Sequence, residues 1–271
     1  MPELPEVETT RRGVAPYLDG ATLQGAIVRE GRLRWPVPPQ LDATLAGLTV
    51  RAVTRRAKYL LVHFDSGTLL IHLGMSGSLR YVPADTPPQK HDHIDLKLGS
   101  NVLRYRDPRR FGAMLWHVGP VEFHSLLKDL GPEPLSDAFD GEVLHAAIAK
   151  RGTAIKLAIM DNHVVVGVGN IYANESLFHA GINPSRAARD LSLADCKRLA
   201  SEIKRVLSLA IEAGGSTLRD FVNTEGKSGY FQQDYYVYDR QEQACRICSS
   251  PIRQIRQGQR SSYYCPLCQP C

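Results

Sequence analysis

The chain has 271 residues, of which 43% are apolar, and its 33 basic and 28 acidic side chains leave a net charge of +5. This length suggests about two domains, and the apolar fraction is ordinary for a folded globular protein. No apolar run approaches the ~18 residues needed to span a membrane, so we expect no membrane partner. The acidic start lacks the basic and apolar segments of a secretory signal, which favours a cytoplasmic protein. The mild positive charge permits a polyanionic partner without establishing one.

The start of the chain combines a helix entry with reactive groups. Removal of Met1 would expose the secondary amine of Pro2. An α-amino group has a pKa near ~8, about two units below that of a lysine side chain, so much more of it is neutral and nucleophilic at neutral pH. Such an amine can form an iminium (Schiff base) with a sugar carbon, and the neighbouring Glu3 and Glu6 could serve as general acids. The same residues also suit a plain helix start, with Pro5 in the first turn.

The first half of the chain predicts one helix followed by strands. Residues 5–18 predict a helix that stops at an Asp-Gly pair. From 21 to about 117 the chain has short apolar or alternating runs broken by Gly, Pro and Asp, including a clear hairpin over 59–73. This texture is typical of a β-sandwich or barrel. We therefore expect an α+β fold, with a leading helix packed on an N-terminal β-sandwich over 2–130.

The second half becomes helical after a candidate linker at 131–136, which reads Gly-Pro-Glu-Pro-Leu-Ser. A helical domain is predicted over 137–225. Ser192 is a suitable N-cap for the last helix, and Gly214-Gly215 would end it. The expected helices cover 141–150, 153–160, 169–179 and 192–213.

The last quarter of the chain holds five of the six cysteines. Two Cys-x-x-Cys pairs separated by about 16 residues predict a tetrahedral zinc site, and four thiolates leave no position open for water. One structural Zn²⁺ is therefore expected, in a β-hairpin unit over 237–271 that turns at Gln257-Gly258. Thiols used in this way suit a reducing compartment. The predicted ligands are Cys245, Cys248, Cys265 and Cys268.

A glycine-rich string, Val-Gly-Val-Gly-Asn-Ile-Tyr-Ala-Asn-Glu at 166–175, lies between two predicted helices. Glycines there permit a tight turn and leave backbone N–H groups free at the start of the second helix, where phosphate binds readily. Taken alone, the string also fits a helix–turn–helix that is packed for structure only. Arginines and lysines also cluster in strand-like segments on both sides of this string in the sequence. Alternate side chains of a strand share one face, so each cluster could form a basic surface.

Together, these strings resemble the formamidopyrimidine-DNA glycosylases, a bacterial family that excises oxidised purines from DNA. The resemblance runs from Pro2 to Gln269 and depends on six strings in the same order. They are Pro-Glu-Leu-Pro-Glu-Val-Glu-Thr after Met1, Arg-Arg-Ala-Lys-Tyr-Leu at 55–60, His-Leu-Gly-Met-Ser-Gly at 72–77, Asp-Pro-Arg-Arg-Phe-Gly at 107–112, the glycine-rich string at 166–175, and Gly-Gln-Arg-Ser-Ser-Tyr-Tyr-Cys-Pro at 258–266.

The resemblance implies an enzyme that acts as a monomer on damaged double-stranded DNA, in the bacterial cytoplasm and at the nucleoid. The substrates would be 8-oxoguanine and formamidopyrimidines. Pro2 would attack C1′ of the flipped nucleotide while Glu3 supplies the acid, and β- then δ-elimination would cut the strand. Lys58 and Arg260 would bind phosphate at the lesion and assist elimination, with Glu6 as an accessory catalytic residue.

An enzyme that excises a base must take it out of the stack, and the gap must be filled. By resemblance Met75, Arg110 and Phe111 fill it, and Arg110 hydrogen-bonds the orphaned base. The segment 217–227 resembles a loop that closes over the flipped base, and Lys156 is a weaker candidate for a phosphate contact. The other implied DNA contacts are His72, His91, Arg151 and Asn170.

Three other functions are compatible with parts of the sequence. An endonuclease VIII-type enzyme for oxidised pyrimidines usually starts Pro-Glu-Gly-Pro-Glu, and Leu4 argues against it. A non-enzymatic zinc-dependent DNA-binding protein would need the same finger but not Pro2. A ribosome-type RNA binder could share the helix–two-turn–helix but would not explain the start of the chain. Small departures from the family pattern occur at Asp239, Ser249 and Ser262.

Overall fold

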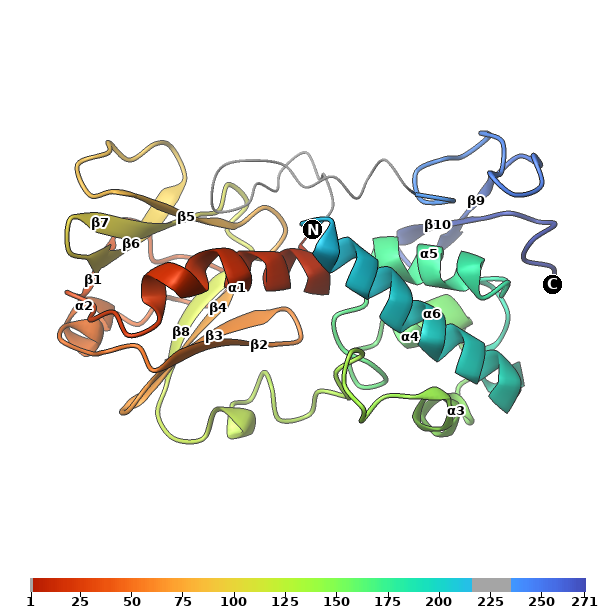
Figure 1. Cartoon of the computed structure of the whole chain (residues 1–271), viewed down its shortest axis with the longest axis horizontal. Coiled ribbons are helices and arrows are strands. Elements are labelled where there is room, and N and C mark those ends of the chain that lie inside the picture. Colours follow the sequence, from red (N-terminus) through yellow and green to blue (C-terminus); the bar gives the residue numbers. More distant parts are fainter. Residues whose placement is uncertain (1, 216–234) are drawn as a thin grey trace. The chain divides into compact units, whose positions relative to one another are not determined.

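The computed structural model describes residues 2–215 and 235–271, which form two compact units (Figure 1). Among these residues the first unit comprises 2–128 and 213–215, and the second comprises 129–212 and 235–271. No helix within the described ranges is both long enough and apolar enough to cross a membrane. The helical region and the cysteine region share one unit, so the separate segments expected at 137–225 and 237–271 stay a prediction.

Helix α1 (Leu4–Leu18) opens the first unit and confirms the predicted first helix. A capping box fixes its start: the carboxylate of Glu6 accepts the backbone N–H of Glu3 at 2.8 Å, and the Glu3 side chain accepts the Glu6 N–H in return. The helix ends at Asp19, and Gly20 then takes a φ of +76°, which reverses the chain at no steric cost.

Two antiparallel four-stranded sheets, ordered β1-β6-β7-β5 and β2-β3-β4-β8, make up the rest of this unit. Their inward side chains share one core with α1; Leu60 and Ile71 of one sheet and Leu103 of the other are fully buried. Helix α1 packs on β2 and β5, an edge strand from each sheet (Figure 1). The β-sandwich and its hairpin are therefore confirmed. The strands are β1 (Ala26–Val28), β2 (Ala52–Arg56), β3 (Tyr59–Phe64), β4 (Gly67–His72), β5 (Ser78–Pro83), β6 (Asp92–Leu98), β7 (Asn101–Arg106) and β8 (Ala113–His117).

One short helix, α2 (Leu41–Leu45), lies where only strands were expected. Leu41 and Leu45 are one turn apart and both are fully buried, so a single turn places two anchors in the core. Asp42 holds the turn to β1, because its Oδ1 accepts the N–H of Ala26 at 2.8 Å. A helix of one turn is too short to produce a readable hydrophobic period.

The second unit confirms the four predicted helices and the hairpin. Asp140 caps α3 by accepting the N–H of Val143 at 2.8 Å, and the predicted cap Ser192 accepts the N–H of Asp195 at 3.1 Å. Helix α6 packs on α3 and α5, and α5 packs on β10. The helices are α3 (Gly141–Ile148), α4 (Ile155–Ile159), α5 (Asn170–His179) and α6 (Leu193–Glu212), and the strands are β9 (Arg253–Gln257) and β10 (Arg260–Tyr264); 3-10 turns lie at Val121–Phe123 and Ala188–Asp190.

A buried ion pair crosses from β7 to β6. The Nε and Nη2 atoms of Arg104 bond the two carboxylate oxygens of Asp95, both at 2.9 Å, and both side chains are only 2% exposed. Burial alone would raise the pKa of Asp95, but hydrogen bonds from Arg104 and Arg29 hold it below its ordinary value. Arg104 also donates to the carbonyl of Thr86 at 3.0 Å, so the pair holds the β5–β6 loop as well.

We expect Arg104→Ala to lower the free energy of unfolding by about 3 kcal/mol, because Asp95 would remain as a buried charge without its main partner. Arg51→Ala is the matched control, since Arg51 makes a similar two-pronged contact with Asp65 at the surface and should have little effect. Urea unfolding followed by circular dichroism compares the two variants. Equal losses would contradict the role assigned to burial.

Candidate active site and zinc centre

Pro2 lies directly before two buried acids at the start of α1. Glu3 is 2% exposed and Glu6 is fully buried. The backbone carbonyl of Glu6 accepts the hydroxyl of Thr10 at 2.8 Å. Glu6 is therefore held through its carbonyl as well as through its carboxylate. A Cβ atom built on Gly215 would lie 3.4 Å from Cγ of Glu6, so the end of the 213–215 segment reaches the helix start. The predicted loop at 217–227 lies outside the described residues.

Lys58 lies in the two-residue turn between β2 and β3, where Ala57 has a φ of +52°. The structure brings its ammonium group near His72, at the end of β4. Burial, assisted by the charges of Lys58 and Arg34, lowers the pKa of His72 to about 4. Its Nδ1 accepts the N–H of Gly74 at 2.9 Å, so the ring is neutral and carries its proton on Nε2. Arg34 was not singled out from the sequence, and only its place in a cluster of arginines pointed to it.

The loop after β4, which carries Met75, meets the loop after β7. A Cβ atom on Gly74 would lie 2.5 Å from the backbone nitrogen of Gly112, so only glycine allows this close approach. Asp107 joins the two loops from a fully buried position: its carboxylate accepts the hydroxyl of Ser76 at 3.2 Å and the N–H of Gly112 at 2.8 Å. The structure therefore confirms that the two strings lie side by side.

The two arginines of the second loop point to different partners. The guanidinium carbon of Arg109 lies 5.1 Å from the ring centroid of Phe111, which is itself 46% exposed. Arg110 has a φ of +56°, and its Nη1 lies 3.4 Å from a carboxylate oxygen of Glu30. By resemblance Arg110 fills the gap together with Met75 and Phe111, and that role stays a prediction. In the structure the arginine that stacks on the Phe111 ring is Arg109. Two adjacent arginines cannot be told apart from the string alone.

His91 lies in the turn before β6 with a φ of +75°. Its carbonyl accepts the N–H of Asp107 at 3.1 Å, which ties this turn to the same loop. Partial burial and then the neighbouring cations, Lys90, Arg106 and Arg110 among them, lower the pKa of His91. The first unit thus gathers Lys58, His72, Met75, His91 and the Arg109–Phe111 pair on connected turns.

In the second unit, Asn170 is the first residue of α5. Its Oδ1 is buried and has no hydrogen-bond partner within the described ranges. One turn later, Asn174 donates to the Asn170 carbonyl at 2.6 Å and accepts the N–H of Tyr263 at 2.7 Å. An amide at a helix start is well placed for a phosphate group.

Arg151 is held by an acid in the turn after α4. Its Nη1 lies 2.6 Å from Oδ2 of Asp161 and its Nε donates to the carbonyl of Ala147. Burial would raise the pKa of Asp161, but hydrogen bonds from His163 and Arg151 lower it to about 2. Arg151 is thus oriented before any ligand binds, and its DNA contact stays a prediction.

Arg260 is exposed at the first residue of β10, and a buried lysine supports the hairpin beneath it. Lys156 is fully buried, and its Nζ donates to the carbonyl of Ser261 at 2.8 Å and to the hydroxyl of Ser262 at 2.7 Å. The Ser262 hydroxyl then donates to Gln257 at 2.6 Å. Ser262 therefore keeps the hydroxyl of the usual threonine, and Lys156 anchors the hairpin from within. A cavity of about 400 Å³ adjoins Arg260 and Asp161.

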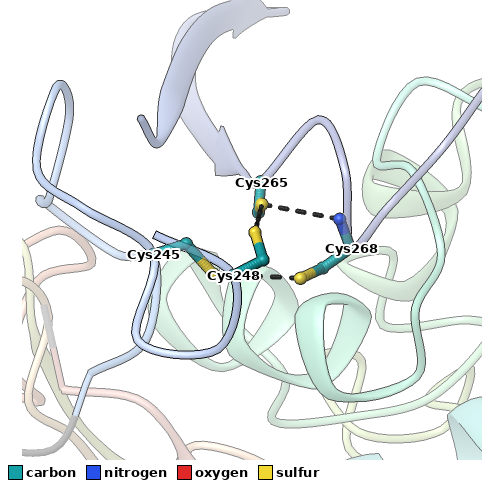
Figure 2. A group of neighbouring side chains, drawn as sticks. All are labelled: Cys245, Cys248, Cys265 and Cys268. Carbon is teal, nitrogen blue, oxygen red and sulfur yellow. Dashed lines mark hydrogen bonds between the residues drawn. The ribbon is translucent and has the colours of Figure 1, made fainter. Parts of the chain in front are cut away.

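The four predicted zinc ligands converge from two turns (Figure 2). The sulfur atoms of Cys248 and Cys265 are 3.4 Å apart, those of Cys245 and Cys268 are 3.8 Å apart, and all four lie within 4.8 Å of one another. Zn–S bonds of about 2.3 Å in a tetrahedron require sulfur atoms about 3.8 Å apart, so this donor set fits zinc. The N–H of Ile247 also points to the sulfur of Cys245, at 3.4 Å.

Glu175 anchors the chain that enters this zinc unit. Its carboxylate, 2% exposed on α5, accepts the backbone N–H groups of Tyr236, Val237 and Tyr238 at 2.9 to 3.0 Å. Burial raises its pKa against the effect of these hydrogen bonds. Nothing in the sequence singled out Glu175, although it closes the glycine-rich string.

Three family domains match the chain in order. They are the formamidopyrimidine-DNA glycosylase N-terminal domain over 1–114, its H2TH domain over 130–222, and a zinc finger found in FPG and IleRS over 242–270. A formamidopyrimidine-DNA glycosylase of Janthinobacterium sp. (strain Marseille) is 58% identical and one of Pseudomonas paraeruginosa is 59% identical, each over 99% of this chain and 100% of the relative.

Solved structures agree with this match. A complex of Lactococcus lactis Fpg with DNA containing an abasic site has a TM-score of 0.92 at 32% identity, over 99% of this chain and all of the other. The MutM (Fpg) protein of Thermus thermophilus has a TM-score of 0.89 at 36% identity, over 99% of this chain and 98% of the other. The N-terminal domain, the helix–two-turn–helix and the zinc finger together define a bifunctional DNA glycosylase and lyase of base-excision repair.

The chain belongs to the formamidopyrimidine-DNA glycosylase family. The predicted family, α+β fold class, enzyme class and structural zinc are thereby confirmed. The roles assigned to single residues stay predictions.

We expect one zinc ion per chain, released by Cys265→Ser but kept by Cys271→Ser, because Cys271 lies outside the cluster. Zinc binds cysteine as the thiolate, so protons compete with it for the ligands, and release by a chelator should become faster as the pH falls from 7 to 5. Zinc content by mass spectrometry and release followed with a coloured chelator measure both effects. Full zinc retention by the Cys265 variant would contradict the assignment.

Proposed function

We propose that this chain excises oxidised purines, 8-oxoguanine and formamidopyrimidines, from double-stranded DNA and then nicks the strand. One observation carries the proposal: Pro2 directly precedes Glu3, a buried acid whose backbone is fixed by Glu6. The L. lactis relative was solved with DNA that contains an abasic site, which supports action on damaged DNA, and the relatives above come from bacteria, which supports action in the bacterial cytoplasm. Action as a monomer and at the nucleoid is part of the same proposal.

In the first chemical step the free amine of Pro2 attacks C1′, and the base leaves with the electron pair of its glycosidic bond. This requires prior removal of Met1, because an acylated nitrogen is not nucleophilic. The proton that the Pro2 nitrogen loses neutralises the departing base anion. The nitrogen lone pair then opens the sugar ring, and O4′ takes a proton from the carboxyl group of Glu3, which is left as a carboxylate. The product is an iminium that links C1′ to Pro2. Glu6 acts here by holding Glu3 in place.

The iminium then makes both strand cuts possible. Loss of a C2′ proton breaks the C3′–O bond, and loss of a C4′ proton breaks the C5′–O bond, so both phosphates depart from the sugar. Lys58 and Arg260 bind the phosphates beside the lesion and stabilise their charge. His72, His91, Arg151 and Asn170 position the strand through further backbone contacts.

The flipped base leaves a gap that Met75, Phe111 and an arginine fill. The close contact of their two loops supports this role, since both are joined by Asp107. We assign the place in the gap to Arg109, because it already stacks on Phe111, and we assign Arg110 to the rim, where Glu30 orients it.

The same function suggests how the chain is divided. We propose a catalytic domain over 2–130, a linker over 131–136, a helix–two-turn–helix domain over 137–225 and a zinc finger over 237–271. The three family matches support this order.

Borohydride trapping on duplex DNA with one 8-oxoguanine opposite cytosine tests the chemistry. We expect a reduced adduct on the N-terminal peptide that starts at Pro2, identified by mass mapping, and none with Pro2→Gly. A chain loaded with zinc and shown to have a free proline amine that gives neither adduct nor cleavage would sink the proposal. Activity on oxidised pyrimidine alone would favour the endonuclease VIII type, and binding without cleavage would favour a DNA-binding protein.

Arg109→Ala and Arg110→Ala separate the two arginines. We expect Arg109→Ala to slow single-turnover excision of 8-oxoguanine about 10- to 100-fold, because the flipped state loses a side chain that offsets part of the unstacking cost, which is about a few kcal/mol per base step. Arg110→Ala should mainly weaken binding and reduce its salt dependence. Excision and binding by both variants are measured on two duplexes, one with cytosine and one with adenine opposite the 8-oxoguanine. The reverse order of effects on excision would return the filling role to Arg110.

A further inference from the structure

Arg55, near the end of β2, touches two parts of the first unit that the chemistry needs. Its Nη1 donates to the carbonyl of Ala57 at 2.9 Å, within the turn that carries Lys58. Its Nε lies 3.4 Å from Oε2 of Glu8 on helix α1, which is an ion pair and not a hydrogen bond. The side chains of Arg55 and Glu8 are only 11% and 12% exposed, so water competes weakly for these contacts.

Glu8 is held in place from several sides. Arg11 bonds both of its carboxylate oxygens, at 2.8 and 3.0 Å, and Arg12 adds a contact at 2.9 Å. Burial would raise the pKa of Glu8, but these hydrogen bonds lower it, so the carboxylate is charged at neutral pH. Arg11 also donates to the carbonyl of Val53 at 3.3 Å, which adds a second link between α1 and β2.

The two links show that α1 and β2 run in opposite directions. Arg11 meets Val53, whereas Glu8, earlier in the helix, meets Arg55, later in the strand. From Glu8 back to Glu3 the helix covers about 7.5 Å at about 1.5 Å per residue, and a strand advances about 3.3 Å per residue toward Lys58. The start of α1 and the β2–β3 turn therefore lie at the same end of this unit (Figure 1).

We propose that Arg55 is a positioning residue that sets the place of Lys58 relative to the N-terminal amine. This inference rests on the proposed function. Ala57 takes a left-handed φ in a turn of two residues, and its carbonyl is fixed by the Arg55 guanidinium rather than by solvent. The charge of Glu8 attracts the same guanidinium toward the helix that begins at Leu4, directly after Pro2 and Glu3. The planar guanidinium can donate to the turn through Nη1 while its charge stays beside the Glu8 carboxylate.

Arg55→Ala tests the proposal, with Arg12→Ala as the matched control. Arg12 bonds the same Glu8 carboxylate, but its side chain is 58% exposed, and among the described residues its polar contacts do not reach the turn. We expect Arg55→Ala to slow single-turnover excision about 10- to 100-fold, the effect of a misplacement of about 1 Å, while the Kd for a duplex with a tetrahydrofuran abasic-site analogue stays within a few fold. Arg12→Ala should match the wild type in both.

A double-variant cycle distinguishes positioning from general destabilisation. If Arg55 acts through Lys58, Arg55→Ala should slow the wild type but not Lys58→Ala, because the group it positions is already gone. Arg55→Lys should be intermediate, since one ammonium cannot both donate to the turn and stay beside Glu8. Equal slowing in the two backgrounds, or a rate like that of the wild type, would overturn the proposal.

Hydrogen exchange of the free protein gives an answer that does not depend on activity. Amides of residues 57–60 should exchange faster in Arg55→Ala than in the wild type or in Arg12→Ala, with thermal midpoints and zinc content showing that each variant is folded. Unchanged exchange in that segment would also refute the inference. A wild type that neither traps nor cleaves would refute the proposed function instead, while the exchange result still decides the role of Arg55.

Discussion

The hydrogen bond from the Glu3 backbone to the Glu6 carboxylate is the constraint on which the first unit depends. The ends of most chains are loosely held unless something ties them down, and an amine that must meet one carbon atom cannot be loose. Here the capping box satisfies two of the open N–H groups at the helix start, and the surrounding core buries both acids. A capping motif common at helix starts thus supports the residue that we propose as the nucleophile.

The second unit relies on the same device, which is a buried polar side chain that holds backbone groups. Lys156 holds the β9–β10 hairpin, Asn174 ties α5 to β10, and Glu175 holds the chain before the zinc ligands. A buried polar group is costly unless it is fully bonded, so each of these side chains admits few alternative arrangements. Zinc fixes the far end of the same region. Rigidity here comes from specific bonds because the hairpin offers little apolar surface of its own.

Much of this organisation could be predicted from the sequence, and the reasons differ by element. Helices α3 and α6 begin at the capping side chains of Asp140 and Ser192, and the zinc site depends on cysteine spacing alone, so local patterns sufficed for these elements. Helix α2 was not predicted, because its single turn is stabilised by the burial of Leu41 and Leu45, which depends on the tertiary structure. Which of the two arginines contacts Phe111 and which contacts Glu30 depends on the directions of their side chains. The sequence of two adjacent arginines does not reveal these directions. Arg55 was visible only as one of several clustered basic residues.

The pairing of the arginines also explains why a net charge of +5 said little about the partner. Arg110 faces Glu30 and Arg151 faces Asp161, so part of the positive charge is already balanced in the free protein. Such pairs hold a side chain in one direction, but a phosphate that approaches must compete with the carboxylate. In the free protein these ion pairs weaken the attraction of the two arginines for phosphate, but they hold both side chains in one direction. For an enzyme that must place one sugar carbon against one amine, orientation contributes more to the rate than added charge, because misplacement by about 1 Å can slow the chemistry by about 100-fold.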